Sequence, residues 1–272
     1  MLEILSYDFM QRAFLAVIAI SIFSPILGIF LILRRQSLMS DTLSHVSLAG
    51  VALGVFIGIS PTWTTILVVS LAAIVLEYLR TVYRHYMEIS TAILMSFGLA
   101  ISLIIISKAN NSNGVGLEQY LFGSIITITA EQVVALFTIA LVVLMLTILF
   151  IRPMYILTFN EETAFVDGLP VRLMSICFNL VTGVAISLMI PAAGALLVST
   201  IMVLPASIAM RIGKSFKAVI TYGILIGFFG MVLGIFISFW AKTPASATIT
   251  IIFIIMFLVV SIVRVIAKLI RK

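Results

Sequence analysis

The sequence predicts an all-α integral membrane protein, a polytopic helical bundle of about nine spans that forms one domain over residues 1–272. Of its 272 residues 63% are hydrophobic and only 10% are charged, more apolar surface than the core of a water-soluble domain absorbs. The apolar residues also form runs of roughly 17–25 residues, the length that crosses a bilayer as a helix. Basic residues cluster at the ends of these runs, so the net charge of +6 needs no nucleic acid as a partner.

Each span is predicted from one apolar run. In chain order the nine runs are 11–33, 40–59, 62–79, 90–107, 132–151, 172–190, 193–210, 218–239 and 246–267. Pro61 separates the second run from the third, and Pro191 separates the sixth from the seventh. The joint at Pro191 is short, and a count of eight spans stays open there. Glu3 and Asp8 precede the first basic residue, Arg12, which is contrary to a cleaved signal peptide, so we expect the first run to remain as a span.

The positions of Lys and Arg predict the orientation. With the N-terminus outside and the C-terminus inside, all but three of the 16 basic residues fall on the inside. The exceptions are Arg12, Lys108 and Lys242. Because cytoplasmic loops of membrane proteins carry the excess of Lys and Arg, we expect an N-out, C-in protein of the cell membrane.

Small residues at four-residue spacing predict close helix packing in two spans. They are Gly50, Gly54 and Gly58 in the second span, and Gly223, Gly227, Gly230 and Gly234 in the eighth. We expect packing within the subunit, with a subunit interface as the alternative. The single cysteine, Cys177, lies in an apolar run and is expected to be a buried structural thiol.

Asp41 and His45 are the ionisable pair that points to chemistry. They lie four residues apart in the second span, so on a helix both side chains project from one face. Ionisable residues inside a span are costly and by default mark a pathway or site. A carboxylate and an imidazole are half of a divalent-metal ligand set, and two copies across a two-fold axis would supply four ligands.

Simpler roles stay open for both residues. Asp41 would be the N-cap of the second helix if that helix begins near Ser40, which would place His45 roughly 8 Å from the inner end. His45 would make an interhelical hydrogen bond. Of the other ionisable residues, Glu77 lies near a span edge, and His85 is expected to be a solvated residue of an inside loop.

Two polar segments are longer than simple connections. On the outside, 117–124 is expected to form a short helix that dips into the outer leaflet. On the inside, Asn160 suits a helix N-cap, Glu161 and Glu162 suit the first turn, and Gly168 suits the stop. These residues predict a short amphipathic helix on the cytoplasmic face, for which a plain surface role is the alternative.

Enzyme motifs are missing from the sequence. No His-Glu-x-x-His motif of a metalloprotease occurs, and Gly213-Lys214-Ser215 lacks the first glycine of a phosphate-binding loop because position 208 is isoleucine. We therefore expect a transport subunit that does not itself hydrolyse ATP.

At Asp41, His45 and the residues around them, the sequence resembles the membrane permease of the metal-uptake ABC transporters, the family of zinc, manganese and iron importers. The resemblance runs through nearly the whole chain and is strongest from Arg34 to Gly54. Further matching pieces are Leu121–Ser124, Ala164–Val171 and Gly194–Val198 through Leu204–Ala206. The Ser-Leu-Ala-Gly that ends at Gly50 is more similar to the zinc members than to the manganese members, where Leu-Pro-Gly is commoner.

The resemblance implies a fold like that of the vitamin B12-type importers, lacking one N-terminal helix. It implies that Asp41 and His45 line the translocation path and bind the transported metal, with no permanently bound cofactor. It also implies that a segment at about 158–171 docks on an ATPase through Glu161, Glu162, Phe165, Gly168, Leu169 and Pro170.

The implied partners are a second copy of this chain, a dimer of a separate ATP-binding subunit, an extracellular metal-binding protein and membrane lipid. Zinc is the expected cargo, and manganese or iron is the alternative within the family. An autonomous secondary cation transporter or channel is the alternative of a different class. An ATPase gene and a lipoprotein gene next to this one would favour the first class.

Overall fold

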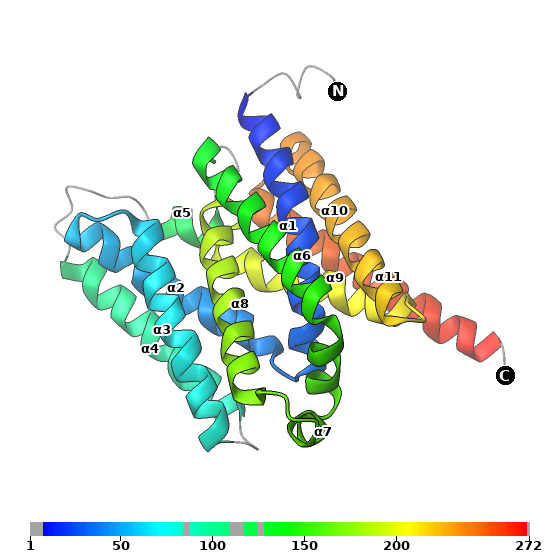
Figure 1. The fold of residues 1–272 in the computed structure, drawn as a ribbon. Helices are drawn as coiled ribbons and strands as arrows, with labels where there is room; N and C mark the ends of the chain where they lie inside the picture. The colour runs from blue at the N-terminus through cyan, green and yellow to red at the C-terminus, as the bar shows by residue number, and fades with distance from the viewer. Residues whose placement is uncertain (1–7, 84–86, 109–116, 124–127, 271–272) are drawn as a thin grey trace.

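The computed structural model describes residues 8–83, 87–108, 117–123 and 128–270, and every regular element in these ranges is an α-helix (Figure 1). The helices are α1 Asp8–Leu33, α2 Ser37–Ile57, α3 Pro61–Val82, α4 Met87–Lys108, α5 Leu117–Phe122, α6 Ala130–Phe159, α7 Glu161–Val166, α8 Val171–Ala193, α9 Ala195–Ile212, α10 Phe216–Ala241 and α11 Ala245–Ile270.

Among the described residues, nine helices are long and apolar enough to cross a membrane, namely α1–α4, α6 and α8–α11. The predicted all-helical bundle of nine spans is confirmed. Several helix boundaries differ from the prediction, and two of them involve proline. Pro191 lies inside α8 rather than between two spans, and the chain breaks at Gly194, whose φ of +81° suits glycine. The fifth span continues to Phe159 as α6, with a bend at Phe150 just before Pro153.

Helix α1 lies at the centre of one half of the bundle, where α6, α9 and α10 pack around it (Figure 1). Its side chains Phe23, Ile26 and Leu31 are at most 1% exposed. In the other half, α2 packs between α3 and α4 and also contacts α9. The helix that carries Asp41 and His45 therefore lies inside the bundle.

The predicted glycine packing within the subunit is confirmed. A Cβ atom added at Gly50 would lie 2.6 Å from the Cα of Thr65, and one at Gly54 would lie 2.8 Å from the Cα of Pro61, so α2 and α3 approach backbone to backbone. Gly58 instead ends α2 with a φ of +79°. In α10, Gly223 and Gly227 face Pro25 of α1, and Gly230 and Gly234 face Phe253 and Ile249 of α11.

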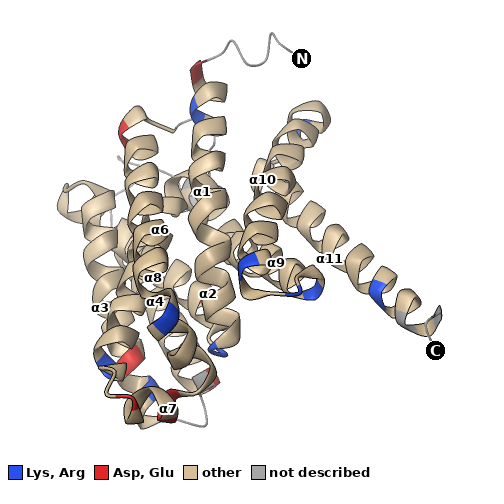
Figure 2. Cartoon of the chain, turned by 45° about the vertical axis from the view of Figure 1, so that its right-hand side comes forward, with Lys and Arg blue, Asp and Glu red and all other residues tan. Residues whose placement is uncertain are grey.

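Basic residues, together with acidic ones, gather at the end of the bundle where α7 lies, which we call the α7 end (Figure 2). Arg80 lies near the end of α3, Arg172 at the start of α8 and Arg34 directly after α1, whereas Arg12 lies near the other end of α1. The prediction for Cys177 is wrong. Cys177 lies in the apolar helix α8, but its side chain is exposed on the isolated chain.

Candidate functional site

Asp41 and His45 lie on one face of α2, as their spacing predicts. The Nε2 atom of His45 lies 3.6 Å from Oδ1 of Asp41, and the two side chains are 14% and 40% exposed, respectively. The two atoms are thus close enough to hold one ion between them. Asp41 remains accessible from outside the bundle, while the imidazole is mostly enclosed.

The interpretation of Asp41 as an N-cap is wrong. Helix α2 begins at Ser37 with Gln36 as its N-cap, and that cap makes no side-chain hydrogen bond. Asp41 is therefore in the second turn, where the backbone N–H groups already have helical partners. The earlier start also places His45 deeper than expected, about 12 Å from the end of the helix at 1.5 Å per residue.

The hydroxyl groups of the neighbouring Ser and Thr residues donate hydrogen bonds to backbone carbonyls of α2 itself. Ser40, Ser44 and Ser47 each donate to a backbone carbonyl of α2, at 3.0, 2.7 and 2.5 Å. Thr42 does the same to the carbonyl of Leu38 at 2.9 Å. The Nδ1 atom of His45 differs, since it is buried without a hydrogen-bond partner among the described residues. Because these hydroxyl groups are already hydrogen-bonded, Asp41 and His45 are the polar side chains of this stretch that are left to bind a ligand.

Ser199 of α9 is a neighbour of the pair that sequence reasoning missed. Its hydroxyl donates to Oδ1 of Asp41 over 3.4 Å, the same oxygen that faces His45. The contact joins residues 158 positions apart in the chain. Only the packing of α2 on α9 brings them together, so no local pattern signals it.

Within the described part of the chain, no group of three or more His, Cys, Asp or Glu side chains lies close enough to hold a metal ion. Asp41 and His45 would by themselves supply only two ligands. Zinc usually takes about four ligands and manganese about six. The pair needs further ligands to retain an ion.

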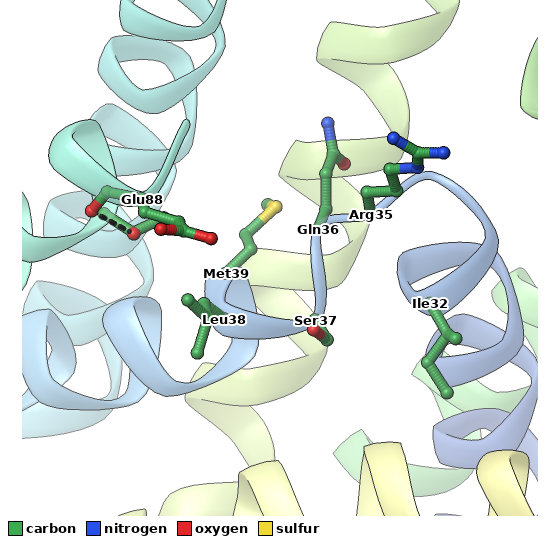
Figure 3. A pocket seen from close by; sticks show the side chains of 8 residues that line it. Ile32, Arg35, Gln36, Ser37, Leu38, Met39 and Glu88 are labelled. Atoms are coloured by element: carbon green, nitrogen blue, oxygen red, sulfur yellow. Dashed lines mark hydrogen bonds between the residues drawn. The ribbon is translucent and has the colours of Figure 1, made fainter. Parts of the chain in front are cut away.

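A cavity of about 310 Å³ lies beside the junction of α1 and α2 (Figure 3). Its polar lining includes Arg35, Gln36, Ser37 and Glu88, and it does not include Asp41 or His45. Gln36 is only 2% exposed, and its amide atoms have no partner among the described residues. The cavity is thus a separate feature near the first turn of α2.

Helix α7 has the start and the stop that the sequence predicts. The side chain of Asn160 accepts a hydrogen bond from the N–H of Thr163 at 3.0 Å. At the other end Gly168 has a φ of +76°, and its N–H and that of Leu169 donate to the carbonyls of Phe165 and Ala164, both at 3.1 Å. This is the Schellman arrangement of a helix C-terminus.

The two faces of α7 have different surroundings. Ala164 is fully buried, whereas Phe165 and Val166 are 74% and 83% exposed. An exposed aromatic ring and an exposed branched side chain next to each other form an apolar surface at the α7 end. Glu162, Gly168 and Pro170 are exposed beside it, and Leu169 is half-buried.

Glu161 binds the bundle, whereas Phe165, one turn later on the same side of α7, is exposed. The Oε1 atom of Glu161 lies 2.9 Å from Nη2 of Arg80, near the end of α3. The same guanidinium group binds both carboxylate oxygens of Glu77, which is 2% exposed. Asn179 of α8 donates to Oε2 of Glu77 at 2.7 Å. The sequence placed Glu77 near a span edge but gave no sign of these partners.

Arg34 adds a second cation to this group. It donates to the hydroxyl of Ser175, and its guanidinium lies 5.1 Å from the ring centre of Phe178. Burial, and after it the nearby charge of Arg80, lower the pKa of Arg34 to about 10. Arg34 therefore remains charged at neutral pH, so two cations face the carboxylates of Glu77 and Glu161.

Some predictions fall on residues that the structure does not describe. They concern His85, the outside segment before α5, and Ser124 after it. Helix α5, Leu117–Phe122, supports the expected short helix in the outside stretch. It packs against α8 and α9, and Gly123 after it lies against the backbone of Ala193 and Gly194.

The comparisons with known proteins agree with this architecture. The family model of the ABC 3 transport family matches residues 6–264. The high-affinity zinc uptake system membrane protein ZnuB of Buchnera aphidicola subsp. Schizaphis graminum is 31% identical, over 89% of this chain and 93% of that protein. The manganese import system permease protein ScaB of Streptococcus gordonii is 29% identical, over 93% of this chain and 90% of that protein.

A solved structure matches as well. PsaBC from Streptococcus pneumoniae, in complex with Fab, superposes with a TM-score of 0.84 at 27% identity, covering 95% of this chain and 93% of that chain. The family match over most of the chain, the nine apolar helices and this common fold lead to one assignment. The chain is a multi-pass cell-membrane protein that belongs to the ABC 3 transport family, the permeases of metal-uptake ABC transporters.

Proposed function

We propose that this chain, acting as a single permease domain over residues 1–272, is the membrane subunit of an ATP-driven importer that moves zinc into the cytoplasm. The observation that carries the proposal is the Asp41–His45 pair, 3.6 Å apart on one face of a membrane-spanning helix. Ionisable residues inside a span are costly, and by default they mark a pathway or a site.

Two copies of the chain complete the metal site in this proposal. A two-fold axis beside α2 brings two Asp41 and two His45 side chains together, which gives the four ligands that zinc prefers. The 40% exposure of Asp41 on the single chain leaves room for that approach. Each chain holds half of the ligands, so the ion is released when the copies move apart.

Zinc is proposed over manganese on two grounds. The ligand set contains imidazole, which suits zinc, whereas manganese prefers oxygen ligands. In addition, the zinc uptake protein of Buchnera aphidicola is 31% identical to this chain. Manganese remains the alternative because the manganese permease of Streptococcus gordonii is similar at 29%.

The α7 end faces the cytoplasm in this proposal, since it collects the basic residues that cytoplasmic loops carry. The segment at about 158–171 then docks on a separate ATP-binding subunit. Phe165 supplies the exposed apolar contact. Gly168 ends helix α7, and Glu161 connects that helix to the bundle. The residues that border the apolar contact are Glu162, Leu169 and Pro170. Apolar helix residues that fill a partner's groove are a common mode of docking.

A reconstituted complex tests the proposal. The permease is placed in liposomes with its ATP-binding subunit, and uptake of radiolabelled zinc is measured with and without ATP. We expect uptake only with ATP, and stronger competition by unlabelled zinc than by manganese. Stronger competition by manganese would assign the cargo to manganese. Uptake by the permease alone, without ATP, would assign the chain to the autonomous transporters or channels.

A further inference from the structure

Within the described residues, helix α7 is held to the bundle by an ion pair as well as by packing. Besides its cap at Asn160 and the buried methyl group of Ala164, it has an ion pair from Glu161 to Arg80 at 2.9 Å. The exposed surface at Phe165 and Val166 lies beside this ion pair, since Phe165 follows Glu161 by one helical turn. A force applied to that surface by a partner is therefore opposed by this ion pair.

Arg80 holds two carboxylates at once because its guanidinium group has a planar set of donors. Nε and Nη2 bind Glu77 at 2.9–3.2 Å, and Nη1 and Nη2 bind Glu161 at 3.5 and 2.9 Å. Nη2 also lies 3.2 Å from the hydroxyl of Ser175. The guanidinium group thus joins α3, α7 and α8 through one side chain.

The inner half of this arrangement is rigidly held. Glu77 is 2% exposed, and it accepts hydrogen bonds from Arg80 of its own helix and from Asn179 of α8. A buried carboxylate without its cation is strongly unfavourable. Arg80 therefore stays with Glu77, and the bond to Glu161, whose side chain is 43% exposed, is the one that is able to open.

The helix that carries Arg80 is the direct neighbour of the helix that carries Asp41 and His45. Helix α3 contacts α2 through the close backbone approach at Gly50 and Gly54. The two backbones are packed closely there, with the side chain of Thr64 beside Gly54, so we expect a movement of α3 to be passed on to α2. Glu161, Arg80 and the α2–α3 contact form a continuous connection from α7 to the candidate metal ligands.

We propose that Arg80 is a positioning residue for energy coupling, which ties α7 to α3 so that movement of α7 reaches the Asp41–His45 pair. The proposal rests on the proposed role of α7 as the docking helix for the ATP-binding subunit. In this arrangement Glu161 is an internal contact of the permease. The neighbouring Glu162 is a surface residue of the docking face.

The test variant is Glu161→Gln, which removes one charge and leaves the buried Arg80–Glu77 pair intact. The matched control is Glu162→Gln, the same change one residue later on an exposed side chain that forms no ion pair within the described residues. The reconstituted complex is assayed for the number of ATP molecules hydrolysed per zinc ion transported. We expect this ratio to rise by up to about fivefold in Glu161→Gln, as for the loss of one partly exposed ion pair, and to rise less in Glu162→Gln, whose side chain borders the docking face without holding α7 to the bundle.

Arg80→Lys is a second variant. Its ammonium group keeps a cation next to Glu77 but does not span both carboxylates, so the ratio should also rise. An unchanged ratio in both Glu161→Gln and Arg80→Lys would overturn the proposal. An equal rise in Glu161→Gln and Glu162→Gln would overturn it too, because the effect would then come from the docking face as a whole.

A measurement on the purified permease separates this inference from the proposed function. Without any partner, hydrogen–deuterium exchange of the α7 amides should be faster in Glu161→Gln than in Glu162→Gln, because only the first variant loses the ion pair to Arg80. The Asn160 cap is present in both variants. Equal exchange would mean that Arg80 does not hold α7 and would overturn the inference. Failure of the unsubstituted complex to transport metal would instead contradict the proposed function and leave the exchange result valid.

Discussion

Replacing Phe165 by alanine should weaken the association of the permease with its ATP-binding subunit. The side chain is 74% exposed on the isolated chain, so a partner that docks there would cover most of its ring. Full burial of a phenylalanine side chain is worth about 1.5–3 kcal/mol. Covering three quarters of it gives about 1–2 kcal/mol, which corresponds to about a fivefold to thirtyfold larger dissociation constant per copy.

Phe165→Asp is the sharper change because it also places a charge in the covered apolar contact. We expect it to abolish metal-dependent ATP hydrolysis by the mixed subunits, while the membrane protein accumulates normally and keeps the oligomeric state of the unsubstituted chain. Trp63→Ala is the matched control, since Trp63 is 71% exposed but lies at the start of α3, far from α7. Unchanged stimulation of hydrolysis in Phe165→Asp would refute the docking role, because α7 would then be only a surface helix.

Two further predictions concern packing and topology. Gly98→Leu should lower the melting temperature in detergent and reduce uptake, since even a Cβ at this position of α4 would lie 2.7 Å from the Cα of Val46 in α2. Such overpacking costs about 1–3 kcal/mol. An unchanged melting temperature would contradict the tight α2–α4 contact. In a Cys177→Ala background, a cysteine at Thr243 should react with an impermeant thiol reagent on intact cells and one at Lys214 should not, and the reverse pattern would overturn the N-out orientation.

The spans and α7 were predictable because the determining signals are local. Hydrophobic length defines a membrane helix, and the Asn160 cap with the Gly168 stop defines a short one. The pairing of Asp41 with His45 follows from helical spacing alone. In each case residues a few positions apart fix the geometry.

Long-range contacts and helix boundaries were not predictable in the same way. Glu77 and Asn179 are 102 positions apart, and only the packing of α3 on α8 explains why the carboxylate is buried. The start of α2 was placed too late because Ser37 and Ser40 make its first turn partly polar, which made Asp41 resemble a cap. Pro191 did not end its helix, since the positive φ of Gly194 marks the break three residues later.

The central claim is that Asp41 and His45 bind the transported metal. Asp41→Asn and His45→Ala test it when uptake of radiolabelled zinc and growth under zinc limitation are measured beside the expression level. We predict that both variants accumulate normally and fail to take up zinc, because asparagine lacks the charge that neutralises a divalent cation and alanine lacks a ligand. Rescue by manganese but not by zinc supplementation would change the cargo to manganese, and normal zinc uptake by both variants would contradict the site.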